Sequence, residues 1–262
     1  MPSPTPSLSA SRSPVVAALR AAGCVFAEDE AELILATART PDELTTMVDR
    51  RVAGLPLEHV LGWAGFHGLR IAVEPGVFVP RRRTEFLVTQ ALARVPRAAV
   101  VVDLCCGSGA VGAALAAALG PVELHAADID PVAVRCARRN IDGHVHAGDL
   151  FEALPDTLRG RVDVLAANVP YVPTDEVPLL PAEARDHEPL TALDGGADGL
   201  DLLRRVADAA PDWLAPGGCL FVETSERQAP AAVEAFSRAG LTASLAESEE
   251  LYAHVVIGVR GG

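Results

Sequence analysis

The tetrapeptide Asn168-Val-Pro-Tyr171 combines three groups that can bind a flat –NH2 group. The amide oxygen of Asn168 can accept one N–H hydrogen bond, and the carbonyl before Pro170 can accept the second, because a residue that precedes proline is biased away from helix. The ring of Tyr171 offers a flat face for stacking. The tetrapeptide follows the apolar run 162–167, at the carboxyl end of a predicted strand, where open α/β sheets bind ligands. A proline-containing turn with a capping asparagine is the alternative for the tetrapeptide taken alone.

A second stretch predicts a site for a nucleotide-like ligand. The β-branched run 100–102 ends in Asp103, and a loop of small residues up to Gly109 leads into the Ala/Leu-rich run 110–119. A strand, a glycine-rich turn and a helix N-terminus in this order bring backbone N–H groups to such a ligand. Gly107 and Gly109 let the backbone pass close to it, although small residues also serve ordinary helix–strand packing.

Three acids follow the next two predicted strands. Asp128 ends the predicted strand 122–127, where a carboxylate can accept both hydrogen bonds of a ribose diol. Helix capping is the alternative for both Asp128 and Asp130, and the spacing from the loop at Asp103 favours ligand binding for Asp128 and capping for Asp130. Asp149 follows the short strand predicted at 144–146 and is placed to hold an adenine amino group.

These groups require a sheet whose parallel strands end at one edge. The chain beyond the tetrapeptide predicts the remaining elements: a helix at 199–213, a turn at 216–218, a strand at 219–223, a helix at 228–239, and an antiparallel closing pair at 241–246 and 253–259. Together with the strands already named, this predicts an α/β fold with a seven-stranded, mostly parallel sheet whose last strand is antiparallel.

The N-terminal part of the chain has a different character. Residues 1–12 are rich in proline and serine and predict a disordered tail, and residues 13–60 predict a small helical domain for packing or partner recognition. Its helices are expected at 14–22, at 28–38 and after Thr40, where Thr-Pro-Asp-Glu forms a capping box. Residues 61–83 predict a β-hairpin linker, followed by an α/β domain over 84–262.

The composition limits the kinds of partner. The chain has 262 residues and a net charge of −13, which disfavours tight binding to a nucleic-acid backbone. Arg81, Arg82 and Arg83 are its only dense positive charge, and they predict either a solvated helix start or a clamp on an anionic group. The five cysteines are scattered and lack metal-ligand spacing, so we expect a reduced, cytoplasmic compartment and no metal. No apolar run approaches the length of a membrane span.

The segments Asp103–Gly109 and Asn168–Tyr171, with Asp128, resemble class I S-adenosylmethionine-dependent methyltransferases that carry an Asn-Pro-Pro-Tyr motif. From about Pro56 to the C-terminus, the chain resembles more specifically the protein-(glutamine-N5) methyltransferases that modify peptide-chain release factors. Five further segments carry this resemblance: Pro56–Gly62, Pro75–Arg81, Thr84-Glu85, Glu188-Pro189 and Ala192–Leu200. The segment Ala192–Leu200 is a specific feature of that subfamily.

The resemblance implies a Rossmann-like class I methyltransferase fold, S-adenosyl-L-methionine as the cofactor, and methyl transfer to a glutamine side chain in the Gly-Gly-Gln loop of a release factor. It implies direct in-line displacement without a strong base. The implied catalytic residues are Asn168, Val169, Pro170 and Tyr171, which also bind the substrate together with Pro80 and Arg81. The implied cofactor-binding residues are Asp103, Cys105, Cys106, Gly107, Ser108, Gly109, Asp128, Ile129, Asp149, Leu150 and Asn168.

Three positions depart from the family pattern. Cys105 stands where the family usually has its first glycine, and its neighbour Cys106 is expected to point into the core. Val169 replaces the first proline of the tetrapeptide, which preserves the carbonyl and costs some rigidity. Arg82-Arg83 replaces the usual Pro-acid pair.

Two other functions remain open at this point. The first is an amino-methyltransferase that acts on adenine or cytosine of a nucleic acid, since these bases also present a planar –NH2 group. The acidic charge and the lack of a large target-recognition insertion count against it. The second is a non-catalytic module whose cofactor site has decayed, which Cys105 and Val169 would support.

Overall fold

The structure, a computed structural model, describes residues 12–95 and 100–262. The chain divides into two compact units, with the boundary between Trp63 and Ala64. Residues 1–11 of the predicted tail lie outside the described residues, and Arg12 already belongs to the first helix. Over the ranges described, no helix has both the length and the apolar character needed to cross a membrane.

The described part of the first unit, from residue 12 onward, consists of four helices: α1 (Arg12–Ala21), α2 (Ala27–Thr37), α3 (Pro41–Val52) and α4 (Leu57–Leu61). Leu19 and Ile34 are fully buried between them. The predicted cap of α3 is confirmed, because the Thr40 hydroxyl accepts a hydrogen bond from the Glu43 N–H at 3.1 Å. The Glu43 carboxylate accepts its return bond from the Arg39 N–H at 2.8 Å. The helical character predicted for this region is therefore correct.

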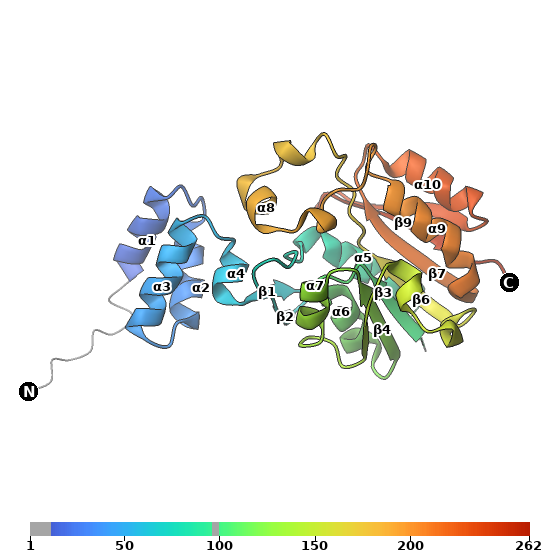
Figure 1. Cartoon of the computed structure of the whole chain (residues 1–262), viewed down its shortest axis with the longest axis horizontal. Helices are drawn as coiled ribbons and strands as arrows, with labels where there is room; N and C mark the ends of the chain where they lie inside the picture. The colour runs from blue at the N-terminus through green and yellow to red at the C-terminus, as the bar shows by residue number, and fades with distance from the viewer. Residues whose placement is uncertain (1–11, 96–99) are drawn as a thin grey trace, which may run out of the picture. The chain divides into compact units, whose positions relative to one another are not determined.

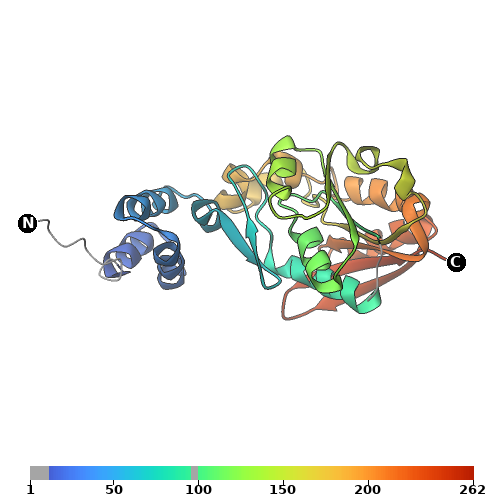
Figure 2. The same ribbon diagram turned by 90° about the horizontal axis from the view of Figure 1, so that it is seen from below.

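The predicted hairpin is present as a two-stranded sheet of β1 (Trp63–Phe66) and β2 (Leu69–Ala72), which lie side by side in Figure 2. Its turn, His67-Gly68, has positive φ at both residues (48° and 77°), as the twist of a two-residue hairpin requires. Phe66 and Ile71 are buried in the core of the second unit. The chain then forms the 3-10 turn η2 (Arg82–Thr84) and the helix α5 (Glu85–Arg94).

The second unit contains the predicted seven-stranded sheet, in the order β5-β4-β3-β6-β7-β9-β8. Its strands are β3 (Val100–Leu104), β4 (Glu123–Asp128), β5 (His144–Ala147), β6 (Val162–Ala167), β7 (Leu214–Thr224), β8 (Thr242–Ser248) and β9 (Ala253–Val259). The strands β3 to β7 pair in parallel, and β9 runs antiparallel to both of its neighbours, β7 and β8. The predicted fold class is confirmed.

Helices cover both faces of this sheet (Figure 1). The remaining helices are α6 (Ala110–Leu119), α7 (Pro131–Ala137), α8 (Ala182–His187), α9 (Asp201–Trp213) and α10 (Ala229–Arg238), with 3-10 turns η3 (Leu150–Ala153), η4 (Asp156–Leu158), η5 (Val177–Leu179) and η6 (Leu190–Ala192). Val100 and Val102 pack with α9 and α10, whereas Val101 packs with α5 and α6. This alternation follows from the two-residue period of a strand.

The turn predicted at 216–218 lies inside β7. The pairing of β6 with β7 shifts from Val162↔Leu214 to Val164↔Cys219, so the intervening residues of β7 bulge out of register. Backbone bonds of 3.0 Å from Gly217 N–H to the Arg260 carbonyl, and from Arg260 N–H to the Gly218 carbonyl, continue the sheet through the bulge. The glycine-rich sequence therefore marks a bulge rather than the strand start predicted at Cys219.

Candidate active site

The carboxyl ends of four adjacent strands bring the candidate residues to one edge of the sheet. Asp103, Asp128 and Asn168 end or follow β3, β4 and β6, and Glu223 lies near the end of β7. The strand order reverses between β3 and β6, because β4 and β5 lie on one side and β7 and β9 on the other. Open α/β sheets bind ligands at such a switch point.

On the β3–β4 half of this edge, the acids at the ends of both strands bind backbone N–H groups. The Asp103 carboxylate is 1% exposed and accepts a hydrogen bond from Gly112 N–H in α6 at 2.8 Å, and burial raises the pKa of Asp103 to about 7. The two oxygens of Asp128 accept from Gly107 N–H at 2.8 Å and from Asp130 N–H at 2.9 Å. Burial also raises the pKa of Asp128. The loop between β3 and α6 is thus fixed by both carboxylates.

Cys105 lies in this loop with a φ of 53°, in the left-handed region that favours glycine. This backbone conformation explains why the resembled family usually has a glycine at this position. Cys106 is 8% exposed and packs in the core, as predicted. Burial, with the charges of nearby aspartates, raises the pKa of both thiols, so neither supplies a thiolate nucleophile.

The rest of the loop is held from the segment that follows α7. Gly107 and Gly109 have positive φ (55° and 79°), and Ser108 is 3% exposed. The side-chain amide of Asn140 donates to the Ser108 carbonyl at 2.8 Å and to the Ala72 carbonyl at 2.9 Å. Asn140 therefore ties the loop to the hairpin, a role that the sequence pattern does not reveal.

The predicted adenine end of the site lies beyond β4 and β5. Asp130 caps α7 through a 2.7 Å bond from Val132 N–H, as predicted. Ile129 is 59% exposed, an unusual state for a large apolar side chain beside a buried carboxylate. Asp149 forms a 2.7 Å ion pair with Arg205 of α9, and the next residue, Leu150, is buried.

The tetrapeptide follows β6. The Asn168 side-chain oxygen is buried and has no hydrogen-bond partner within the described ranges, while Val169 is 1% exposed. The Tyr171 hydroxyl donates to Glu223 at 3.1 Å and accepts from Arg83 at 2.5 Å, and Arg83 Nε donates to the same Glu223 oxygen at 2.9 Å. Burial and the Glu223 charge raise the pKa of Tyr171, which keeps its phenol protonated.

Four buried polar atoms around this edge have no hydrogen-bond partner among the residues that the structure describes. They are Thr84 Oγ1, Asn168 Oδ1, Glu223 Oε2 and Thr224 Oγ1. Buried polar groups are almost always hydrogen-bonded in native proteins. Three of these unpartnered polar atoms, on Asn168, Glu223 and Thr224, lie at the ends of β6 and β7, which indicates that a polar ligand belongs there.

The tetrapeptide is supported from behind by the segment 192–200. Val172 forms a parallel bridge with Asp194, and a Cβ at Gly195 would lie 2.6 Å from the Pro170 carbonyl. A Cβ at Gly199 would overlap the Tyr171 carbonyl. The buried Gln228 amide donates to that carbonyl and to the Asp198 carbonyl, both at 2.8 Å. The family-specific glycines therefore allow close packing against the tetrapeptide.

Arg81 has an internal partner. Its guanidinium binds both carboxylate oxygens of the buried Glu188 at 2.6 Å, and Glu188 also accepts from Val79 N–H at 3.2 Å. This pair fixes the chain before η2 to the segment that follows α8, and Pro80 is half-buried beside it. The charge of Arg81 is therefore paired within the protein, and no anionic ligand is needed to explain its presence.

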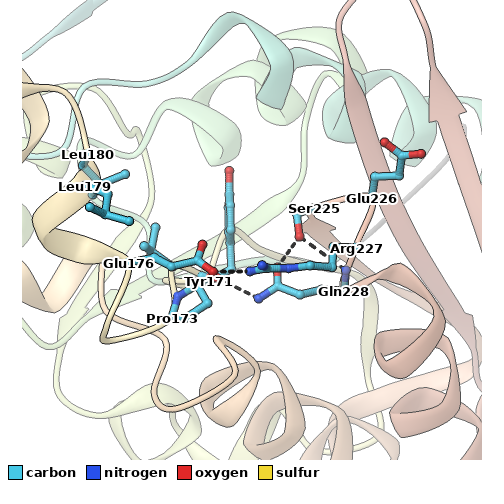
Figure 3. A pocket seen from close by; sticks show the side chains of 10 residues that line it. Tyr171, Pro173, Glu176, Leu179, Leu180, Ser225, Glu226, Arg227 and Gln228 are labelled. Atoms are coloured by element: carbon cyan, nitrogen blue, oxygen red, sulfur yellow. Dashed lines mark hydrogen bonds and ion pairs between the residues drawn. The ribbon is translucent and has the colours of Figure 1, made fainter.

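A cavity of about 520 Å³ opens next to the tetrapeptide (Figure 3). Leu179 and Leu180 lie on one side of it, and the turn 225–228 lies on the other, with the Tyr171 ring between them. Leu179 is 80% exposed. The cavity therefore joins an apolar surface to the candidate site.

Sequence reasoning did not identify Glu223, Gln228 or the partnership of Arg83 with Tyr171. Glu223 had a usable signal, because it lies near the carboxyl end of a predicted strand, as Asp103 and Asp128 do. Gln228 and Arg83 are joined to the tetrapeptide only by tertiary contacts, which no local spacing reports.

Comparison with known proteins shows the family and supports the fold. A family model described as "Methyltransferase small domain" matches residues 68–179. The chain is 41% identical over 208 residues to "Release factor glutamine methyltransferase" of Geobacter sulfurreducens, covering 76% of this chain and 72% of the relative. It is 43% identical over 189 residues to the protein of the same name from Streptomyces coelicolor, covering 70% and 67%. Among solved structures, a methyltransferase from Pyrococcus furiosus superposes with a TM-score of 0.56 at 19% identity, covering 74% of this chain and 90% of that one, which supports the fold.

Proposed function

Because the chain belongs to the family of release factor glutamine methyltransferases, we propose that it methylates the side-chain amide nitrogen of a glutamine in a peptide-chain release factor, in the cytoplasm. The observation that best supports this reaction is the buried, unpartnered Asn168 oxygen at the carboxyl edge of β6. A primary amide presents the N–H groups that such an acceptor requires.

S-adenosylmethionine fits the β3–β4 half of the sheet edge. Asp128 retains acceptor capacity for a ribose diol, since each of its oxygens uses one lone pair on the backbone. Ile129 offers an exposed apolar surface for the adenine ring, beside Asp149 and Leu150, and the loop from Asp103 to Gly109 would follow the rest of the molecule. When bound, the cofactor supplies an electrophilic methyl group on a positively charged sulfur.

The acceptor amide is a poor nucleophile, because its nitrogen lone pair is shared with the carbonyl. The Asn168 oxygen and the Val169 carbonyl would accept its two N–H bonds and stabilise the positive charge that develops on nitrogen. The Tyr171 ring would fix the plane of the amide. The C–N bond would form as the C–S bond breaks, the sulfur would leave as a neutral thioether, and the nitrogen would release one N–H proton to water. Alignment of this kind can lower the barrier by about 7 kcal/mol.

The cavity beside Tyr171 supports a protein substrate. A glutamine side chain held at Asn168 is attached to a backbone that must lie outside the tetrapeptide, and the cavity lined by Leu179 and Leu180 provides that space. The acidic net charge of −13 disfavours the nucleic-acid alternative.

Mass spectrometry of a recombinant release factor after incubation with the protein and S-adenosylmethionine tests the proposal. We expect one added methyl group on the glutamine of the Gly-Gly-Gln loop, and none when that glutamine is replaced by alanine. Parallel reactions with DNA and RNA cover the amino-methyltransferase alternative. Methylated adenine or cytosine with an unmodified release factor would refute the protein substrate, and calorimetry without detectable S-adenosylmethionine binding would indicate a decayed site.

A further inference from the structure

We propose that Arg83 is a positioning residue for methyl transfer, which fixes the Tyr171 ring by binding both its hydroxyl group and the Glu223 carboxylate. This inference rests on the function proposed above. It concerns a residue that departs from the family pattern, since Arg82-Arg83 stands where the resembled enzymes usually have a Pro-acid pair.

The three side chains form a closed triangle of hydrogen bonds. Arg83 donates to Glu223 at 2.9 Å and to the Tyr171 hydroxyl at 2.5 Å, and that hydroxyl donates to Glu223 at 3.1 Å. The Arg83 guanidinium carbon also lies 5.8 Å from the centre of the Tyr171 ring. A planar guanidinium with several donors can make both bonds at once, which an ammonium group does less well.

This ion pair differs from an ordinary surface pair in its burial. The Glu223 side chain is 2% exposed, whereas that of Arg83 is 46% exposed. Glu223 Oε1 accepts from both partners, and Glu223 Oε2 has none within the described part of the chain. Removal of the guanidinium would leave a buried carboxylate with a single neutral donor, which is costly and favours rearrangement of the triangle.

Tyr171 is then held at both of its ends. Gln228 binds its backbone carbonyl at 2.8 Å, and the triangle binds its hydroxyl. These contacts fix the long axis of the ring, and the two hydrogen bonds at the hydroxyl favour one rotation about that axis, because a phenol donates and accepts best in the plane of its ring. The plane of the ring is the feature that the proposed reaction needs, because the amide is expected to stack against it.

The triangle also adjoins Asn168. The register of β6 with β7 pairs Ala167 with Val222, so Asn168 and Glu223 are the next positions on two adjacent parallel strands. Both carry an unpartnered buried oxygen. Loss of Arg83 is therefore expected to disturb the acceptor half of the site and leave the loop at Asp128 intact.

Steady-state kinetics of Arg83→Met, with release factor as substrate, tests the inference. Methionine keeps an apolar stem of similar length and removes the guanidinium. We expect kcat to fall tenfold to roughly 100-fold, because small misplacements of reacting groups have effects of this size, while the Kd for S-adenosylmethionine stays within about twofold. Arg83→Lys should recover part of kcat, since it restores the charge. The matched control is Arg82→Met, because the Arg82 side chain is exposed and forms no hydrogen bond or ion pair with residues 12–95 or 100–262; its kcat should be unchanged.

A double-mutant cycle separates positioning from a general loss of stability. Tyr171→Phe removes only the hydroxyl, and its effect on kcat should be non-additive with that of Arg83→Met if both act through the orientation of the ring. Wild-type kcat in Arg83→Met, or additive effects in the double variant, would overturn the inference. Wild-type protein that does not methylate the release factor would instead refute the proposed function.

Discussion

The two halves of the sheet edge satisfy their polar groups in opposite ways. On the β3–β4 half, Asp103 and Asp128 accept hydrogen bonds from the backbone N–H groups of Gly112, Gly107 and Asp130. On the β6–β7 half, Asn168 Oδ1 and Glu223 Oε2 are buried and have no partner among the described residues, although Glu223 Oε1 accepts from Arg83 and Tyr171. The first half is organised by the chain itself, whereas the second requires a ligand to complete its hydrogen bonds.

This difference suits the two proposed partners. A cofactor that is bound in every turnover benefits from a rigid loop, because ordering a loop on binding costs affinity. The acceptor amide gains more if its hydrogen bonds strengthen only as charge develops on nitrogen, since such bonds raise kcat. Changes in the first half should therefore affect cofactor affinity or stability, and changes in the second should affect kcat.

The largest effect is expected for Asn168→Ala. The variant removes the side-chain acceptor for the amide, so kcat should fall by about 1,000-fold, the upper end of the range measured for loss of a preorganised transition-state contact. Calorimetry should find that the Kd for S-adenosylmethionine changes by no more than a few fold. Loss of cofactor binding would show that Asn168 contributes to cofactor affinity, and the proposed difference between the two halves of the site would be wrong.

The pH dependence of stability tests the buried state of Asp103. Its folded pKa of about 7 lies above its ordinary value of 3.8. Between these values the unfolded chain has released the proton while the folded protein still binds it, so the free energy of unfolding falls as pH rises from about 4 to 7. The full contribution is about 4 kcal/mol. Denaturant unfolding of Asp103→Asn, which cannot titrate, should show a smaller decrease over this range than the wild type; an identical decrease would show that Asp103 ionises normally.

Asp128→Asn should weaken cofactor binding by about 30-fold, because a neutral amide cannot replace a carboxylate that binds the loop and the ribose together. Isothermal titration calorimetry measures this change directly. Asp130→Asn is the matched control, since asparagine caps a helix as well as aspartate, and its Kd should stay within about twofold. Equal losses in the two variants would mean that overall charge, rather than the position of Asp128, governs affinity.

The sequence carries stronger signals for one half of the sheet edge than for the other. Asp128, Asp130 and the loop lie at the edge where the sequence predicts them, because strand ends, glycines and caps leave local signals. The support for the tetrapeptide has no local signal: Gln228 reaches Tyr171 from the turn after β7, and Arg83 reaches it from before α5. The same limit explains the bulge in β7, whose pairing with Arg260 overrides a glycine-rich turn signal. Tertiary contacts between distant segments decide these features.

The smallest effect is expected for Cys105→Gly, which tests whether the loop between β3 and α6 is strained at this position. A side chain at a φ of 53° costs about 1–2 kcal/mol, and glycine relieves this cost, although it increases the entropy of the unfolded chain and removes some packing. We therefore expect a net stabilisation of about 0.5–1 kcal/mol and a Tm higher by about 2–3 °C, measured by thermal and denaturant unfolding. Cys105→Ala is the control, because alanine keeps the Cβ and the strain while it loses the thiol. A stabilisation of equal size in both variants would assign the effect to the thiol rather than to the backbone, and the usual glycine of the family would then need another explanation.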